Sequence, residues 1–208
     1  MARLGDNPIP GTTGYAEVIE RFASASQALD FAVVCCAFVP FLPASGASVL
    51  DVGAGIGQNA AALARRGFRV TAVEPLAVFR ERGQRLFKDL TIKWCADALP
   101  DMTSFAARGT SFAFILVEGV WHHLDEPERR AALSRLHGLL SLGGCLALSL
   151  RSGPPGAGTW VFPTDPGTTR REAEALGFHC RWASENEPSV YPHRPQVRWA
   201  RLVLAKRG

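Results

Sequence analysis

The sequence predicts an α/β fold in which parallel strands alternate with helices, and three observations carry this prediction. A short, β-branched run, Val49–Val52, stops at glycine and suits a buried parallel strand. An Ala/Leu-rich segment follows it and ends at Gly67, which is a typical helix stop signal. A second strand then covers residues 69–73 and ends in an acid, Glu74. This strand, helix and strand form the repeating unit of α/β proteins.

The turn between the first strand and its helix contains three alternate glycines, Gly53, Gly55 and Gly57. Without Cβ atoms, the backbone of this turn allows a ligand to lie directly against a helix N-terminus. Asp51 ends the strand before the turn, and Glu74 reaches the same edge of the sheet. An acid in the place of Glu74 can accept hydrogen bonds from both hydroxyls of a ribose. These residues therefore predict a nucleoside-containing cofactor.

Two cofactor classes use such an arrangement. Gly55, Gly57 and Ala60 satisfy the spacing G-x-G-x-x-G/A of nicotinamide dinucleotide enzymes, a weak match when taken alone. The pattern D/E-x-G-x-G-x-G is complete from Asp51 onward, and in it the chain resembles the class I S-adenosylmethionine (SAM) dependent methyltransferases. A carboxylate at the end of a buried strand is costly without a partner. It suits a sulfonium and an ammonium better than a pyrophosphate, so SAM is the favoured cofactor.

The resemblance implies a Rossmann-like, seven-stranded, mostly parallel sheet with flanking helices and an antiparallel last strand. SAM would lie across the edges of the first three strands. Asp51 and the three glycines would hold its methionine part, and Glu74 its ribose. A third strand, residues 91–96, delivers Asp97, which would accept from the adenine amino group while the Ala98 amide faces the ring. The alternative is that Asp97 caps a turn.

The rest of the chain completes a single domain over residues 1–208, with an N-terminal helical cap at 1–47, a SAM-binding core at 48–150 and a substrate-side part at 151–208. Further strands are expected at 112–117, 145–150, 178–184 and 197–204, the last two antiparallel. Further helices are expected at 76–88, interrupted by glycine, after a capping box at 125–128, and after a second capping box at 169–172.

The N-terminal part is expected to be an irregular leader over residues 1–13, followed by one or two amphipathic helices over 15–39. These helices either cover the sheet or roof the substrate pocket with Tyr15, Phe22 and Phe31.

The loop after the fourth strand holds the candidates for the reacting group: Glu118, Trp121, His122 and His123. Glu118 is expected beside the cofactor, and Trp121 could stack on an aromatic substrate or face the sulfonium by a cation–π contact. Either imidazole could take a proton near neutral pH. The alternative is that one histidine caps the next helix and the other is solvated. Because neighbouring residues alternate in direction, at most one is expected to face the pocket, and we select His122.

Arg151 begins a glycine- and proline-rich loop at the same edge of the sheet. It could clamp a substrate carboxylate or phosphate, or it is a surface arginine at a strand end. Tyr191 and His193, in the late loop, are weaker candidates.

Composition and missing motifs narrow the function. The net charge is +4, yet the arginines are scattered among acids, which argues against nucleic-acid binding. The five cysteines form no C-x-x-C pair, and we expect a reduced, cytoplasmic protein without a signal peptide or membrane span. The loop after the fourth strand lacks the Asn/Asp-Pro-Pro-aromatic motif of nucleobase amino methyltransferases, and it offers too few carboxylates for a metal site.

The sequence therefore predicts an enzyme that transfers a methyl group from SAM to an oxygen or nitrogen of a small, possibly aromatic, molecule. One alternative is an NAD(P)-dependent oxidoreductase. The other is a SAM-binding protein without transferase activity. The ligand that binds distinguishes these two alternatives: the oxidoreductase binds a dinucleotide, and the non-transferring protein binds SAM.

Overall fold

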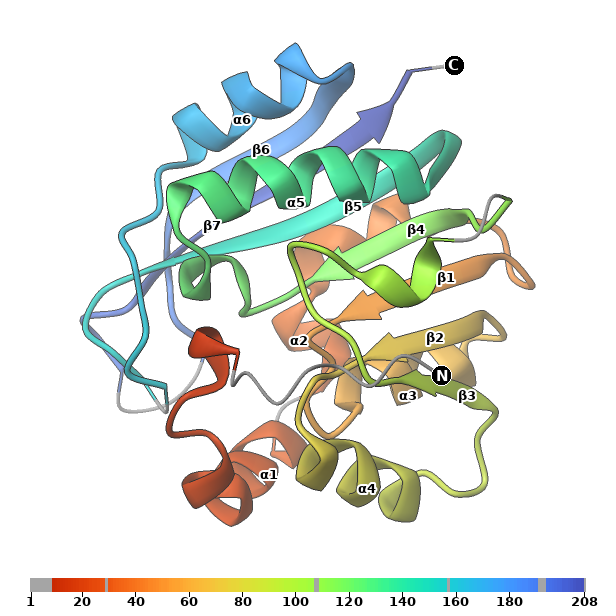
Figure 1. Cartoon of the computed structure of the whole chain (residues 1–208), viewed down its shortest axis with the longest axis vertical. Helices are drawn as coiled ribbons and strands as arrows, with labels where there is room; N and C mark the ends of the chain where they lie inside the picture. Colours follow the sequence, from red (N-terminus) through yellow and green to blue (C-terminus); the bar gives the residue numbers. More distant parts are fainter. Residues whose placement is uncertain (1–8, 29, 107–108, 157, 191–193, 208) are drawn as a thin grey trace.

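The structure is a computed structural model that describes residues 9–28, 30–106, 109–156, 158–190 and 194–207. Its centre is a seven-stranded sheet with the strand order β3-β2-β1-β4-β5-β7-β6 (Figure 1). The pairs among β1 to β5 are parallel, whereas β7 runs antiparallel to both β5 and β6. The predicted fold class is therefore confirmed, including the antiparallel last strand.

The strands lie close to the predicted ranges. They are β1 (Ser48–Val52), β2 (Arg69–Val73), β3 (Ile92–Cys95), β4 (Phe112–Val117), β5 (Leu140–Ser152), β6 (Phe178–Pro188) and β7 (Arg198–Lys206). The main differences are at β5, which begins five residues before the predicted start at 145, and at β6, which continues beyond 184. Both extensions pair with neighbouring strands, at Leu140 with β4 and at Glu187 with β7. Such pairing is decided by tertiary contacts rather than by the local apolar pattern.

The helices are α1 (Ile19–Gln27), α2 (Phe31–Val34), α3 (Gln58–Arg65), α4 (Ala77–Leu86), α5 (Glu126–Leu139) and α6 (Pro166–Ala175). The predicted capping box of α5 is confirmed, because the Asp125 side chain accepts from the Glu128 amide and the Glu128 side chain accepts from the Asp125 amide.

Two predictions about helices were wrong. Gly83 does not interrupt α4, because it is a buried contact point, where an added Cβ would lie 2.5 Å from Trp94 and 2.6 Å from the Ile56 carbonyl oxygen. The second capping box does not start α6 either. Asp165 caps that helix by accepting from the Thr168 amide, and Thr169 lies buried inside its first turn.

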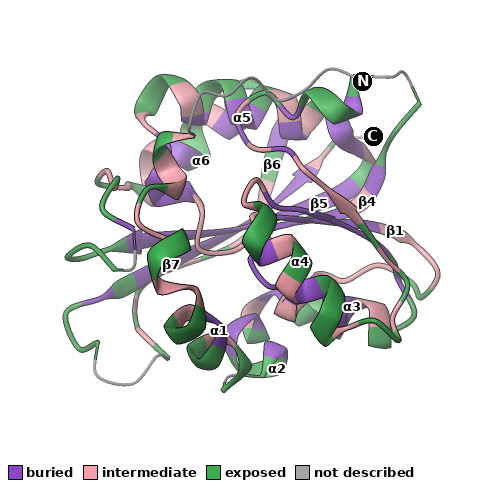
Figure 2. Cartoon of the chain, turned by 60° about the horizontal axis from the view of Figure 1, so that its bottom comes forward, coloured by how far each residue is buried: buried purple, intermediate pink, exposed green. Residues whose placement is uncertain are grey.

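Helices cover both faces of the sheet, which makes three layers (Figure 2). On one side, α5 and α6 pack through residues such as Leu133 and Ala173 against Leu50 and Ile115. The opposite face of the sheet packs against α2 and α3, for example through Phe31. Because both faces are buried, the central strands are almost continuously apolar, as expected of parallel strands.

The N-terminal segment lies over the carboxyl edge of the sheet. Residues 1–8 of the predicted leader lie outside the described residues, and residues 9–13 contain a short 3-10 turn, Pro10–Thr12, rather than irregular chain only. Behind it, the side chains of Tyr15 and Phe22 pack with Phe79 of α4 in a small apolar cluster. Phe31 is not part of this roof, because α2 turns it into the core under the sheet, as in the alternative that the N-terminal helices cover the sheet.

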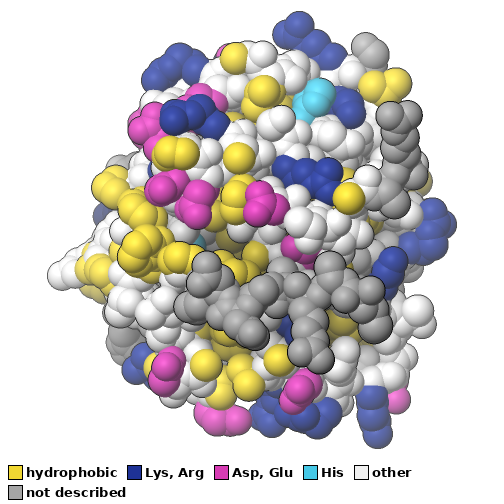
Figure 3. Space-filling model, in the orientation of Figure 1, with side chains coloured by type: hydrophobic (Ala, Val, Ile, Leu, Met, Phe, Trp, Pro, Cys, Tyr) yellow, Lys and Arg dark blue, Asp and Glu magenta, His cyan; other side chains and the backbone are white. Residues whose placement is uncertain are grey.

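Positive and negative side chains are interspersed on the face shown in Figure 3. None of the helices in the described part of the chain is long and apolar enough to cross a membrane.

Candidate functional site

A cavity of about 350 Å³ opens at the carboxyl ends of β1, β2 and β4, where the strand order reverses. Ligands of open α/β sheets bind at such a reversal point. Most of the predicted site residues line this cavity: Tyr15, Gly53, Gly55, Glu74, Asp97, Ala98, Glu118, His122 and Arg151. Three predicted residues do not line it: Asp51, Gly57 and Trp121.

The glycine-rich turn is packed tightly by side chains from elsewhere in the chain. Gly53 has a φ of +71°, and a Cβ built on it would lie 2.2 Å from Cγ2 of Val120. A Cβ on Gly55 would lie 3.1 Å from the Phe22 ring. Gly57 precedes α3 with a φ of +84°, and a Cβ built on it would lie 2.6 Å from the Trp94 ring. Gly57 thus serves helix and strand packing, and its predicted role in holding the cofactor stays a prediction.

Glu74 is buried at the wall of the cavity and is held by two backbone amides. Its Oε2 accepts from the Gly55 N–H and its Oε1 from the Leu76 N–H, both at 2.9 Å. Burial raises the pKa of this carboxyl to about 7, although the two amide hydrogen bonds act in the opposite direction. Each carboxylate oxygen has a second lone pair, so Glu74 can still accept from a ligand's hydroxyls.

Asp97 lies on the adjoining part of the wall and also accepts from backbone amides. Its Oδ1 accepts from the Ala98 N–H at 2.8 Å and its Oδ2 from the Ser104 N–H at 2.7 Å. The Ala98 amide therefore points at the Asp97 carboxylate, as in the turn-capping alternative, while both residues also line the cavity.

Two further carboxyls are buried at this end of the molecule, Asp51 and Glu118. Burial raises the pKa of each to about 7, and the charges of Glu118 and Glu74 raise that of Asp51 further. One oxygen of each, Oδ2 of Asp51 and Oε2 of Glu118, has no hydrogen-bond partner among the described residues. The positive charge of Arg201 lowers the pKa of Glu118, but Arg201 already forms an ion pair with Glu187. Glu118 lines the cavity, whereas Asp51 lies behind it.

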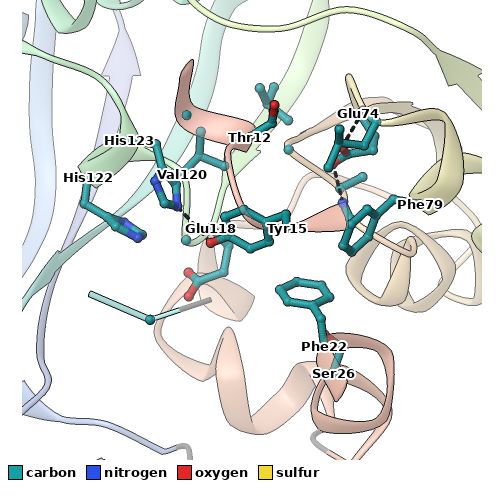
Figure 4. A pocket seen from close by; sticks show the side chains of 18 of the residues that line it. Thr12, Tyr15, Phe22, Ser26, Glu74, Phe79, Glu118, Val120, His122 and His123 are labelled. Carbon is teal, nitrogen blue, oxygen red and sulfur yellow. Dashed lines mark hydrogen bonds between the residues drawn. The ribbon is translucent and has the colours of Figure 1, made fainter. Parts of the chain in front are cut away.

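The geometry fixes the protonation state of His123. Its Nδ1 lies 2.7 Å from the Trp160 carbonyl oxygen, which can only accept, so Nδ1 carries the proton. Nε2 is then the acceptor for the Tyr15 hydroxyl, 2.9 Å away. Figure 4 shows the Tyr15 ring between His123 and Phe79, with Glu118 beside it. A hydrogen-bonded tyrosine and histidine thus join the N-terminal segment to the loop after β4.

The neighbouring residues depart from two predictions. Trp121 is completely buried among the apolar residues that pack against α5, so its predicted place in the pocket was wrong. Both His122 and His123 line the cavity, although at most one was expected there. The reason is that Trp121–His123 form a 3-10 turn, in which successive residues point about 120° apart rather than in opposite directions.

His122 is a poor base in this site. Burial, together with the nearby His123, Arg151 and Arg129, lowers its pKa to about 2. Its Nδ1 has no hydrogen-bond partner among the described residues. His122 therefore stands neutral at the wall of the cavity.

Arg151 lies in the cavity wall at the end of β5, and only 7% of it is exposed. Its guanidinium donates to the Gly153 and Pro154 carbonyl oxygens, at 3.4 and 2.6 Å. Burial, and next the charge of Arg194, lower its pKa. Arg194 also lines the cavity and was not predicted. Tyr191 and His193, the weaker candidates of the same loop, lie outside the described residues.

The other lining residues that sequence reasoning missed are apolar: Phe79, Val120, Val197 and Trp199. Val120 could have been predicted, because it lies in the loop after β4 between the candidates Glu118 and Trp121. Nothing local marks Phe79 or Trp199, because helix and strand patterns explain both as core residues.

Comparison with known proteins finds a similarity over the part of the chain that holds this site. A family model described as a methyltransferase domain matches residues 49–144, from β1 to the start of β5. Residues 49–144 of this chain are therefore similar to a methyltransferase domain. The matched range contains the glycine-rich turn, Glu74, Asp97 and the histidine pair.

The curated relatives of the methyltransferase domain are mycobacterial. Three proteins described as uncharacterized methyltransferases, from Mycobacterium tuberculosis and Mycobacterium bovis, are each 36% identical to this chain over 126 residues. The matched part covers 58% of this chain and 61% of each relative, so the chain spans less than two thirds of their length.

Solved structures share the fold over nearly the whole chain. A TehB-like SAM-dependent methyltransferase from Corynebacterium glutamicum has a TM-score of 0.64 at 24% identity and covers 97% of this chain and 100% of its own. A 1,6-didemethyltoxoflavin N1-methyltransferase from Burkholderia thailandensis was solved with S-adenosylhomocysteine. It has a TM-score of 0.66 at 20% identity, and the match covers 98% of this chain and 93% of the neighbour. The cyclase SpnF has a TM-score of 0.73 at 14% identity, and the match covers 96% of this chain and 97% of SpnF. At these identities the likeness shows the fold alone.

Within the described ranges, no group of three or more His, Cys, Asp or Glu side chains is arranged to hold a metal ion.

Proposed function

We propose that this chain transfers a methyl group from SAM to an oxygen or nitrogen of a small molecule. The observation that carries the proposal is the set of buried carboxyls at the carboxyl ends of β1, β2 and β4, with Glu74 and Glu118 in the cavity wall and Asp51 behind it. Buried carboxylates are stabilised by a cation and repelled by an anion. A ligand with a sulfonium and an ammonium fits this end, whereas a pyrophosphate does not.

The residues suggest how the cofactor would be held. Glu74 would accept from the ribose hydroxyls, and Asp97 would accept from the adenine amino group on the adjoining wall. Glu118 would face the positively charged part, and Asp51 would act on it from behind through its charge. When SAM is bound, it supplies an electrophilic methyl whose carbon–sulfur bond breaks toward sulfur as the acceptor's lone pair bonds to carbon.

The acceptor loses one proton in this reaction, and we assign the proton acceptor to the pair of Tyr15 and His123 rather than to His122. The Tyr15 oxygen can take the proton as its own proton passes to His123 Nε2, along the hydrogen bond of 2.9 Å. The Trp160 carbonyl holds the imidazole in the required tautomer. His122, with a pKa of about 2, instead contributes an uncharged polar wall.

A small acceptor is supported by the dimensions of the cavity, which must hold both cofactor and acceptor. The neighbour from Burkholderia thailandensis is named for a small heterocyclic substrate, 1,6-didemethyltoxoflavin. An oxidoreductase remains a weaker candidate because no observation of the cavity favours a dinucleotide. A SAM-binding protein without transferase activity is the second alternative, and the fold alone does not exclude it, since SpnF is a cyclase of the same fold.

The test is calorimetric titration of the protein with SAM, S-adenosylhomocysteine and NADH. We expect both sulfur compounds to bind and NADH to give no heat. Glu74→Gln should lower the affinity for S-adenosylhomocysteine about 100-fold, because two charge-assisted hydrogen bonds are weakened. Glu81→Gln, an exposed acid of α4, is the matched control and should change nothing.

Binding of NADH alone would overturn the proposal in favour of hydride transfer. Transfer itself is tested by release of S-adenosylhomocysteine in the presence of a panel of phenols, amines and heterocycles. Tight SAM binding without release for any acceptor would support the non-transferring alternative.

A further inference from the structure

We propose that the acceptor carries a negatively charged group, a carboxylate or a phosphate, which is bound by Arg151 and Arg194 in the wall of the cavity. This inference rests on the proposed methyl transfer and names the class of its acceptor.

The two arginines meet around a glycine of the loop after β5. A Cβ placed on Gly156 would lie 3.4 Å from Nη1 of Arg194 and 4.0 Å from Nη2 of Arg151. One point in the cavity wall is therefore close to both guanidinium groups, which come from β5 and from the segment before β7. All three residues line the cavity. Converging guanidinium groups are the usual way in which proteins bind carboxylate and phosphate.

The charges of these arginines are not neutralised by the protein. Among the described residues, neither arginine forms an ion pair with an acid. The neighbours of the Arg151 guanidinium are carbonyl oxygens, which take two of its five N–H groups. Two like charges held together in a partly buried place repel each other unless an anion lies between them. A bound anion would remove that repulsion.

Arg151 also lies next to the residues assigned to the reaction. Its charge is felt at Tyr15, at His122 and at His123. An anion held by Arg151 would therefore place the rest of a small acceptor beside the Tyr15 hydroxyl. Glu74 also lines the cavity, and its charge would repel an anionic acceptor from the place proposed for the cofactor.

The competing explanation is that the arginines bind the carboxylate of the cofactor's methionine part. The two explanations differ in what an arginine variant loses. If the arginines bind the acceptor, S-adenosylhomocysteine should bind to Arg194→Gln as tightly as to the wild type. If they bind the cofactor, that affinity should fall together with the affinity for anions.

The experiment is calorimetric titration of the protein saturated with S-adenosylhomocysteine, with benzoate, inorganic phosphate and neutral benzamide as probes. We expect at least one anion to bind with a dissociation constant of about 10 mM or lower, and we expect benzamide not to bind. Arg194→Gln should weaken anion binding about tenfold, because a charge-assisted hydrogen bond is lost. Arg198→Gln is the matched control, because Arg198 is an exposed arginine at the start of β7 and does not line the cavity.

Arg151→Gln should have the larger effect, but its side chain supports the loop. Arg194 is exposed, so its variant keeps the fold and carries the test. The inference is overturned if neither anion binds to the saturated wild type, if Arg198→Gln weakens binding as much as Arg194→Gln, or if cofactor affinity falls in step. Since S-adenosylhomocysteine binding is measured first, its absence would instead contradict the proposed methyl transfer.

Discussion

The two walls of the cavity are built in different ways. At the acidic wall, the carboxyls of Glu74 and Asp97 accept from backbone amides, and each pairs with residues close to it in the sheet edge. At the opposite wall, side chains meet from distant parts of the chain, as when Tyr15 bonds to His123, 108 residues away. The first wall depends on the backbone of the sheet, and the second on how loops pack over it.

This difference suggests a division of roles. Backbone amides at strand ends are held by the sheet and give a rigid site, which suits a cofactor that is the same for every member of a family. Loops tolerate substitution and carry specificity. We therefore expect substitutions at the acidic wall to affect the cofactor, and those at the opposite wall to affect the acceptor.

The largest effect that tests the comparison is expected at Gly53 in the acidic wall. Gly53→Ala should lower the free energy of unfolding by about 3 kcal/mol, since a positive φ and a clash with Val120 act together. Binding of S-adenosylhomocysteine should be lost in parallel. The measurement is urea unfolding followed by calorimetry.

Gly46→Ala is the matched control, because Gly46 has a φ of +85° but no atom within 4 Å of an added Cβ. It should cost about 1 kcal/mol, the backbone strain alone. The double variant Gly53→Ala with Val120→Ala should recover part of the loss. If both single glycine variants were equally destabilised, the close packing of the turn would not matter.

The pH dependence of cofactor binding should report on the same wall. The pKa of Glu74 is raised to about 7 in the free protein, so this carboxyl is protonated below that pH and must ionise to accept from both ribose hydroxyls. The affinity for S-adenosylhomocysteine should therefore fall about tenfold from about pH 7.5 to about pH 6. Glu74→Gln should show a flatter profile. An affinity that rose on acidification would contradict the assigned role.

Glu118→Gln should separate the charge of the cofactor from its shape. In our proposal Glu118 faces the positively charged part of SAM. The variant should therefore lower the affinity for SAM about tenfold more than the affinity for S-adenosylhomocysteine, which has no sulfonium. Equal losses for the two ligands would place Glu118 away from the sulfur.

The same variant should be more stable than the wild type in alkaline solution. The folded-state pKa of Glu118 lies above its unfolded value, so its contribution to stability is present at low pH and is lost as the pH rises through about 7. At about pH 8 the free energy of unfolding of Glu118→Gln should exceed that of the wild type by about 2 kcal/mol, and below about pH 4, where the carboxyl is protonated in both folded and unfolded chains, the two should agree. Urea unfolding at both values measures this difference.

The smallest effect is expected at the opposite wall. Tyr15→Phe keeps the ring contacts with Phe22 and Phe79 but removes the hydrogen bond to His123. It should lower the free energy of unfolding by about 1 kcal/mol and leave S-adenosylhomocysteine affinity within about twofold. With an accepted substrate, turnover should fall at constant cofactor affinity. A parallel loss of cofactor affinity would show that the two walls do not act separately.

The sequence by itself determined the fold and most of the acidic wall. Strand ends, alternate glycines and the acids Glu74 and Asp97 are local features, because the carboxyl edge of a parallel sheet collects whatever follows each strand. The same local argument failed for Trp121, since a 3-10 turn changes which residues face inward.

Only the tertiary structure decided the opposite wall. The bond between Tyr15 and His123 and the approach of Arg194 to Arg151 each join segments that are distant in sequence. No periodicity or motif encodes such contacts. They depend on how the N-terminal segment and the late loops fold over the sheet, where apolar burial and hydrogen bonding choose among many arrangements of the same local structure.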